Sequence, residues 1–588
     1  MKHQVLGTLV GNTGEPHNLS IVLNSSFAGR RGEFVRIRHQ ERDDESVTYV
    51  LGRIIKISRS NLLYNSGFGN SVSELELLPG AEVTGEHVYA TVDLVGYKDP
   101  LTQQIKIPRR PLDPGAKVET VDYQFLSDFY EFNEQDSLHL GNLVGYEQGE
   151  NTVPVYIDVN KLVTEHLAVL AMTGSGKSYT VGRIIERLVT LHNGTVVVFD
   201  PHGEYGKALQ GGKLNFGNDF DTEDRLDKKV LPEIRKMMES LQAAGAGVQI
   251  YTPQAKAFRT KYANKNTPLA LQFDRFEMDD ISEILPGLTE PQQRVLDVAI
   301  RYWRNVDSAE PRDINRLRYL LSEGLDEIKQ WEDLSSGEAQ ALNGRSAAVA
   351  SMKLSRVLAE AQSFYSADLA EPTDIYQMVG RPSDKKGRLV VVDLQGLSDT
   401  AKQVVCGLLS SEILRAASSK TDKTRPCFLV YEEGHNFAPA GGKAVSHRII
   451  KKIAGEGRKF GVGLMLVSQR PYRLDETVCS QMNSYIILRL KNERDQRFVK
   501  NTMENWDNEE AKQLPNFANG QGIVSGQITN IPLTVQIKFD DDLTNDDMGD
   551  EDFIADVQNW KDSENSKKKK ILSKDLDKVF EADQRRPH

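Results

Sequence analysis

The stretch Leu167-Ala-Val-Leu-Ala-Met-Thr-Gly-Ser-Gly-Lys-Ser-Tyr-Thr180 decides the fold. It begins with a short apolar run, Leu167 to Leu170, which is typical of a buried strand. A turn that contains two glycines follows, and the residues from Tyr179 to Thr190 are predicted to form a helix with apolar residues on one face. A strand, a glycine turn, a Lys-Ser pair and a helix in this order predict a phosphate-binding loop.

The predicted ligand of this loop is ATP with Mg²⁺. Backbone N–H groups of the glycine turn surround the β-phosphate, Lys177 reaches the β- and γ-oxygens, and the Ser178 hydroxyl binds Mg²⁺. The chain has Ala171 where the pattern G-x-x-x-x-G-K-[ST] begins with glycine, and alanine is the smallest replacement. A glycine-rich turn without a ligand is the alternative. The candidate nucleotide-binding residues are Thr173, Gly174, Ser175, Gly176, Lys177, Ser178 and Tyr179.

Length and charge limit the classes of protein that remain. A chain of 588 residues predicts three or four domains. The formal net charge of -11 argues against a protein that coats DNA statically, but it allows a ring with a basic inner surface. Three scattered cysteines indicate neither a zinc site nor disulfides. Without an apolar run of membrane-spanning length or a secretory leader, the expected location is cytoplasmic, with no membrane partner.

The chain divides into five predicted segments. Residues 1–145 are rich in β-branched and aromatic residues between turn-formers, which predicts a small β-barrel. Residues 146–269 and 381–540 alternate apolar strands with helices and are expected to form a mainly parallel α/β sheet of RecA-like type. Residues 270–380 are predicted to be a helical insertion. Residues 541–588, with acidic and lysine blocks, are predicted to be a mobile extension, and a docking arm or a DNA tether is the alternative.

Several smaller expectations concern these segments. The helical insertion is predicted to contain helices from Thr289 to Trp303, from Arg312 to Trp331 and from Ala347 to Phe364. Strands over 522–526 and 531–538 are expected to pair as a closing hairpin. The basic residues of the barrel segment have two interpretations, solvated strand edges or a nucleic-acid face. These residues are Arg30, Arg31, Arg36, Arg38, Arg109 and Arg110.

Two adjacent acids form the second half of the predicted ATP site. An apolar strand that ends at Tyr431 is followed by Glu432 and Glu433. Glu432 is expected to hold Mg²⁺ through its hydration shell. Glu433 is expected to be the general base that activates water for attack on the γ-phosphate.

Polar residues at two other strand ends are further candidates. Asp200 follows the strand from Thr195 to Phe199 and either contacts Mg²⁺ or fixes the loop in which His202 and Glu204 also lie. Gln469 ends the strand that follows the acids in the chain. It either senses the γ-phosphate or closes the strand end with a hydrogen bond.

One arginine is a candidate for action on a neighbouring subunit. The predicted helix from Val445 to Lys459 is basic and ends with Arg458. An arginine in this place can enter the ATP site of an adjacent copy and neutralise charge in the transition state. The lysines of this helix are candidates for contacts with DNA phosphates.

These motifs together resemble the HerA-type ATPases, in the HerA/FtsK branch of RecA-like motors. The motifs that carry the resemblance are 172–178, 199–205, 431–437, 457–462 and 467–471. The resemblance implies an N-terminal barrel of the HAS type and a homo-hexameric ring that moves along double-stranded DNA by hydrolysing ATP. It implies that Arg458 acts in trans and that a partner is present, either a NurA-like nuclease or an effector of an antiviral defence operon. Many members have arginine before the residue that matches His166, and this chain has Glu165 there.

Two functions of different classes follow from these observations. The first is a DNA translocase or helicase whose ATP turnover rises with duplex DNA. The second is an ATP-gated ring scaffold that assembles and activates a nuclease or an NAD-consuming effector, with turnover that DNA barely changes. A helicase with two RecA-like lobes is disfavoured, because the order of segments offers no second lobe.

Overall fold

The computed structural model describes residues 4–11, 18–24, 29–41, 47–61, 86–130, 136–146, 152–203, 205, 247–253, 267–271, 285, 287–306, 314–361, 373–442, 444–502, 512–529 and 532–537. The predicted extension 541–588 lies outside these residues, as does Glu204. Among the described helices, none is long and apolar enough to cross a membrane.

The N-terminal part is a closed antiparallel barrel, as predicted. Its strands are β1 (Val5–Val10), β2 (Leu19–Leu23), β3 (Phe34–His39), β4 (Thr48–Asn61), β5 (Glu86–Lys98) and β7 (Lys117–Thr120), with the short β6 (Ile105–Lys106) added to β5. The sheet order is β2-β1-β7-β3-β4-β5-β6, and the pairing of β2 with β5 closes the ring. Alternate residues such as Ile21, Val35, Ile37 and Val92 fill its interior. A short helix, α2 (Tyr123–Tyr130), follows β7.

One basic side chain of the barrel is engaged within the chain. The guanidinium of Arg36 donates two hydrogen bonds to Glu119 Oε2, each of 2.9 Å, and lies over the ring of Tyr49. The Arg36 side chain is only 11% exposed and β3 is paired on both sides, so Arg36 is an ion-pair residue within the barrel and fits neither the solvated strand edge nor the nucleic-acid face.

The core is a mixed sheet in the order β13-β12-β14-β11-β15-β16-β10-β17-β18-β19-β8-β9. The strands from β13 to β17 run parallel, and those from β14 to β17 are almost fully buried, because helices cover a parallel sheet. They are β10 (Leu167–Leu170), β11 (Thr195–Asp200), β12 (Gly247–Pro253), β13 (Thr267–Leu269), β14 (Arg388–Asp393), β15 (Cys427–Tyr431), β16 (Val462–Ser468) and β17 (Ser484–Leu488). The predicted α/β core is therefore confirmed.

The remaining strands continue this sheet in antiparallel fashion. The predicted closing hairpin is β18 (Gln521–Gly526) with β19 (Leu533–Ile537). Beyond it, β8 (Ser137–Leu143) pairs with β19, and β9 (Pro154–Asp158) pairs with β8. Since β8 precedes residue 145, sheet pairing joins it to the core rather than to the barrel. The predicted boundaries of the segments stay predictions.

Helices pack on the core sheet and form the insertion. Helix α4 (Lys177–Thr190) packs against β10, β11 and β14, whereas α15 (His447–Glu456) packs against β16 and α14 (Asp399–Ser418). Helix α3 (Val159–Thr164) leads into β10, and α16 (Glu476–Cys479) and α17 (Glu493–Thr502) flank β17.

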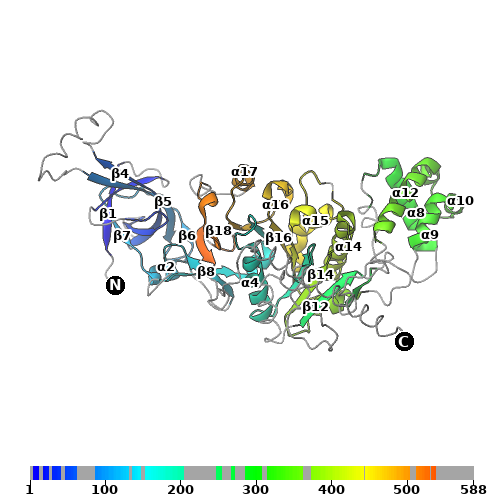
Figure 1. Ribbon diagram of the computed structural model, residues 1–588, viewed down its shortest axis with the longest axis horizontal. Helices are drawn as coiled ribbons and strands as arrows, with labels where there is room; N and C mark the ends of the chain where they lie inside the picture. Colours follow the sequence, from blue (N-terminus) through cyan, green and yellow to red (C-terminus); the bar gives the residue numbers. More distant parts are fainter. Residues whose placement is uncertain are drawn as a thin grey trace, which may run out of the picture. The chain divides into compact units, whose positions relative to one another are not determined.

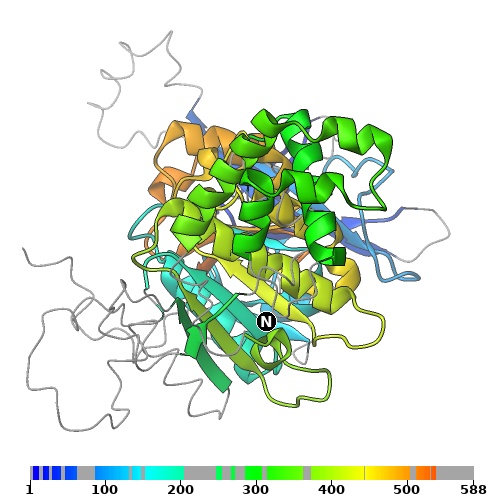
Figure 2. The same ribbon diagram turned by 90° about the vertical axis from the view of Figure 1, so that its right-hand side faces the viewer.

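The insertion is a bundle of helices, drawn in green in Figures 1 and 2. It contains α8 (Glu290–Val306), α9 (Ile314–Ser322), α10 (Leu325–Lys329), α11 (Ser336–Ala341) and α12 (Gly344–Ala361), and α13 (Ile375–Val379) leads back to the sheet. The single helix predicted from Arg312 to Trp331 was wrong, because it breaks between α9 and α10. A Cβ on Gly324 would lie 3.0 Å from Leu320 Cα, so the chain turns tightly there.

Candidate active site

The predicted strand, turn and helix around Lys177 are present. All four residues of β10 are buried, and α4 begins at Lys177 with Gly176 as its N-cap. Gly174 and Gly176 have φ angles of 72° and 95°, a region that favours glycine. No side chain caps this helix, so N–H groups of its first turn are available to an anionic ligand.

Neighbouring segments hold the loop in this conformation. The Ser175 hydroxyl donates to the Met172 carbonyl at 2.6 Å, and the backbone N–H of Gly520 donates to the Ser175 carbonyl at 3.0 Å. A guanidinium nitrogen of Arg489 lies 3.3 Å from the Gly174 carbonyl, to which it donates. A Cβ on Gly176 would approach Gly520 N to 3.2 Å, so glycine also suits the close packing of these two segments. Sequence reasoning gave no role to Arg489 or Gly520, because they lie more than 300 residues from the loop.

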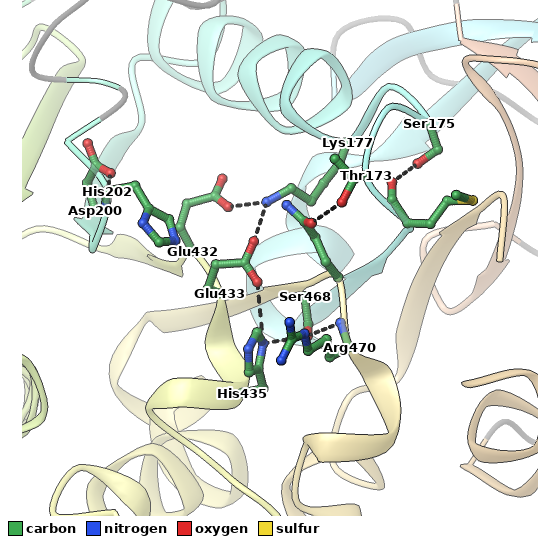
Figure 3. A network of polar contacts seen from close by, with 12 residues as sticks. Thr173, Ser175, Lys177, Asp200, His202, Glu432, Glu433, His435, Ser468 and Arg470 are labelled. Atoms are coloured by element: carbon green, nitrogen blue, oxygen red, sulfur yellow. Dashed lines mark hydrogen bonds and ion pairs between the residues drawn. The ribbon is translucent and has the colours of Figure 1, made fainter. Parts of the chain in front are cut away.

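The two predicted acids meet the loop lysine. Lys177 Nζ donates to Glu432 Oε2 at 2.9 Å and to Glu433 Oε1 at 3.2 Å, as Figure 3 shows. The three side chains are only 5–8% exposed. Glu433 has a φ of 50°, which is rare for a non-glycine residue and is a strained conformation often found at functional sites. The site therefore places two buried carboxylates where a lysine-bound phosphate would lie.

A tyrosine that sequence reasoning did not select orients one acid. The hydroxyl of the fully buried Tyr205 donates to Glu432 Oε1 at 2.9 Å. Asp200 accepts the backbone N–H of Tyr205 at 2.9 Å and that of His202 at 3.3 Å. This geometry supports the loop-fixing role of Asp200, and its contact with Mg²⁺ stays a prediction. The available signal for Tyr205 was its place at the end of the motif 199–205.

A histidine lies beside the other acid. His435 Nδ1 is 3.4 Å from Glu433 Oε2 and 3.1 Å from the Ser468 hydroxyl oxygen. Burial lowers the pKa of His435, although the Glu433 carboxylate acts in the opposite direction. A neutral imidazole with its proton on Nδ1 can share this one N–H between the Glu433 carboxylate and the Ser468 hydroxyl oxygen, and the contact helps to fix the position of Glu433.

Gln469 connects the next strand to the loop. The Thr173 hydroxyl donates to Gln469 Oε1, and Gln469 directly follows β16. Because β16 pairs with both β10 and β15, the amide lies between the loop and the acids. The structure thus brings Gln469 to the phosphate loop, and its contact with a γ-phosphate stays a prediction.

Arg458 is the predicted site residue that lies apart from the others. It belongs to the 3₁₀ turn η6 (Gly457–Phe460), which precedes β16, whereas the acids and Gln469 lie at the carboxyl ends of their strands. The seven residues of β16 separate these two edges of the sheet by about 20 Å. This distance exceeds the reach of an arginine side chain, so Arg458 does not serve the site of its own chain. Its Nη1 instead lies 2.6 Å from Glu165 Oε1.

Two families of known domains match this chain. Residues 138–413 match the family described as Helicase HerA, central domain, and residues 6–100 match the HAS barrel domain. The chain contains the central domain of the HerA helicases. The matched segments cover most of the barrel, the phosphate loop and part of the sheet that holds the acids.

Relatives named HerA align with this chain over most of its length. The DNA double-strand break repair helicase HerA of Pyrococcus furiosus is 27% identical over 553 residues, which cover 88% of this chain and 89% of the relative. The protein of the same name from Sulfurisphaera tokodaii is 25% identical, with 95% of this chain and 99% of the relative covered.

Distant likenesses also occur among solved structures. The VirB4 structure from Thermoanaerobacter pseudethanolicus has a TM-score of 0.42 at 15% identity and covers 70% of this chain and 99% of its own. Plasmid coupling protein TrwB in complex with ADP and Mg²⁺ has a TM-score of 0.44 at 14% identity, with 71% and 92% covered.

Proposed function

We propose that this HerA-type ATPase is a homo-hexameric ring that uses ATP hydrolysis to move along double-stranded DNA. The observation that carries the proposal is the separation of Lys177 and Arg458 on opposite edges of one sheet. An ATP site that uses both residues needs two copies of the chain, and a closed ring supplies that arrangement at every interface. The relatives named as DNA double-strand break repair helicases support DNA as the substrate on which the ring acts.

The residues at the carboxyl edge account for triphosphate binding. The first turn of α4 and Lys177 hold the β- and γ-phosphates. Ser178 in that turn and Glu432 offer the oxygen ligands that Mg²⁺ prefers, so this pair would hold the metal. Mg²⁺, when bound, neutralises charge on the phosphate oxygens.

Glu433 then acts as the general base. When Lys177 shares its charge with phosphate oxygens, the Glu433 carboxylate can accept the proton of a water that attacks the γ-phosphorus. The bond to the β-phosphate oxygen breaks, and ADP and phosphate result. His435 holds Glu433 on one side, and Gln469, tied to Thr173, places an amide next to the transferred phosphate.

An exposed basic face supplies the contact with DNA. Arg448, Lys451 and Lys452 are exposed on α15. Cations of this kind bind duplex phosphates without reading sequence, which suits a motor that must pass every base pair. This local face reconciles DNA binding with the net charge of -11. We include in the proposal a partner, either a NurA-like nuclease or an antiviral effector, which the ring would feed or activate.

Turnover with and without DNA tests the function. ATP hydrolysis by the purified chain should rise several-fold when linear duplex is added, and Glu433→Gln should slow this hydrolysis about 10²–10⁴-fold. Replacing Lys451 and Lys452 by Ala should weaken the DNA response and leave DNA-free turnover unchanged. A turnover that linear duplex leaves unaltered would favour the ATP-gated scaffold over the motor.

A further inference from the structure

The contact between Arg458 and Glu165 has a feature that an ordinary surface ion pair lacks. The Glu165 side chain is only 12% exposed, whereas that of Arg458 is 62% exposed. The acid is therefore embedded in the fold, and the guanidinium projects from it toward solvent. The pair has one fixed partner and one accessible partner.

Glu165 is anchored on its own side of the contact. Its Oε2 accepts a hydrogen bond of 2.9 Å from the Asn483 side chain, and its carbonyl accepts one of 3.0 Å from the Asn483 backbone N–H. The backbone N–H of Glu165 donates to Lys161 O at the end of α3. These bonds leave Oε1 as the oxygen that faces Arg458.

The backbone on both sides of the pair is closely packed. A Cβ on Gly457 would lie 2.5 Å from the Val462 carbonyl, and one on Gly463 would lie 2.4 Å from the Val163 carbonyl. The turn that carries Arg458 and the helix α3, which ends directly before Glu165, therefore both pack directly on β16. Backbone contacts with β16 therefore set the distance between the backbones of Arg458 and Glu165.

The residue after Glu165, His166, is not a second cation that could pair with the Glu165 carboxylate. His166 is 2% exposed, its Nδ1 accepts the Leu464 backbone N–H at 3.1 Å, and burial lowers its pKa to about 4. His166 is neutral at physiological pH, and Arg458 is the cation at the carboxylate.

We propose that Glu165 is a positioning residue, which holds Arg458 at the amino edge of the sheet in the orientation that enters the ATP site of an adjacent copy. The inference rests on the proposed ring. The contact with Glu165 uses one terminal nitrogen, Nη1, of the Arg458 guanidinium. A guanidinium has five N–H donors, so the N–H groups that do not face Glu165 can bind a phosphate. An arginine without a partner loses rotamer entropy when it docks at a neighbour's ATP site. An arginine that an ion pair already holds in place has lost that entropy beforehand, so its docking costs less free energy.

The alternative role for such a pair is a latch that withholds Arg458 from the neighbour. The two roles predict opposite changes in ATP turnover when Glu165 is replaced. Removal of a positioning carboxylate lowers turnover, whereas removal of a latch raises it.

Mixed rings separate the subunit that donates the arginine from the subunit that hydrolyses ATP. A Glu433→Gln chain can donate Arg458 but cannot hydrolyse, and an Arg458→Ala chain can hydrolyse only with a neighbour's arginine. Mixing the two should restore turnover at their shared interfaces. Adding Glu165→Ala to the donor should lower the restored kcat about tenfold, with KM changed less than twofold, because the arginine acts on the transition state. Adding Glu165→Ala to the hydrolysing chain should leave the restored kcat unchanged.

Control variants and the possible outcomes complete the test. Glu456→Ala removes an exposed carboxylate two residues before Arg458 and should leave the restored kcat unchanged. Glu165→Gln keeps an acceptor oxygen and should recover part of the loss. Ring assembly, measured by mass photometry, should match in all mixtures. A donor with Glu165→Ala that restores equal or higher turnover overturns the positioning role, and the trans arrangement stands. If the Glu433→Gln and Arg458→Ala mixture itself stays inactive, the proposed ring mechanism fails and the role of Glu165 with it.

Discussion

Replacing Lys177 by methionine should destabilise the protein as well as inactivate it. The ammonium lies 2.9 Å from one buried carboxylate oxygen and 3.2 Å from another, and the three side chains are 5–8% exposed. At an effective dielectric constant of about 20, these contacts correspond to gross attractions of about 6 and about 5 kcal/mol. Most of that attraction offsets the cost of removing the charges from water.

The net effect follows from what the substitution leaves behind. Methionine fills a similar volume but leaves Glu432 and Glu433 buried without their cation. Breaking a buried ion pair in this way costs roughly 3–5 kcal/mol. Glu433→Gln has the opposite consequence, since Lys177 and Glu432 remain as a neutral pair. We expect it to change the free energy of unfolding by less than about 1 kcal/mol.

Urea unfolding without nucleotide, followed by circular dichroism, measures both variants against the wild-type chain. Comparing the two variants separates the effect of charge balance on stability from any effect on catalysis. Both variants should be inactive, but only Lys177→Met should be unstable. A Lys177→Met chain as stable as wild type would refute the reasoning. So would a Glu433→Gln chain that loses as much stability as Lys177→Met.

Three further predictions concern catalysis and pH. Glu433→Gln should slow ATP hydrolysis about 10²–10⁴-fold while a fluorescent ATP analogue still binds, and loss of binding would argue against its role as base. Tyr205→Phe removes the hydrogen bond to Glu432, so the Mg²⁺ concentration for half-maximal turnover should rise roughly tenfold, and an unchanged Mg²⁺ titration would contradict this. His166 has a pKa lowered from 6.5 to about 4, so the unfolded chain takes up its proton first, and stability should fall by about 2 kcal/mol from this residue between pH 8 and pH 5. His166→Asn, which suits the φ of 59° and has an oxygen to accept the Leu464 N–H, should therefore lose less stability over that pH range in urea unfolding.

The local chemistry of the ATP site could be predicted because each part of it is encoded in a short segment. An apolar run followed by Gly174, Gly176 and Lys177 specifies a strand, a turn and a helix start through burial and permitted φ angles. An apolar run that ends in Glu432 and Glu433 places two acids at the carboxyl edge of a parallel sheet. These inferences require only the period of the hydrophobic pattern and the identity of the residues that end it.

Contacts between distant segments could not be predicted in this way. The hydrophobic pattern marks a strand as buried but does not state its neighbours, so nothing in residues 137–143 indicated that β8 joins the core sheet through β19. The hydroxyl of Tyr205 reaches Glu432 across 227 positions, and Arg489 reaches the Gly174 carbonyl across 315. The break at Gly324 depended on its packing against the preceding turn, which helix periodicity does not reveal.

The sequence by itself determined which residues can grip a triphosphate and activate water, because glycine conformation, charge and burial act within a few positions. Tertiary structure alone decided where Arg458 lies relative to them. Strand direction in the parallel sheet sends the acids to one edge and leaves Arg458 about 20 Å away at the other, beside Glu165. The length and direction of β16 thus decide whether Arg458 can reach the ATP site of its own chain. A local pattern of residues does not specify them.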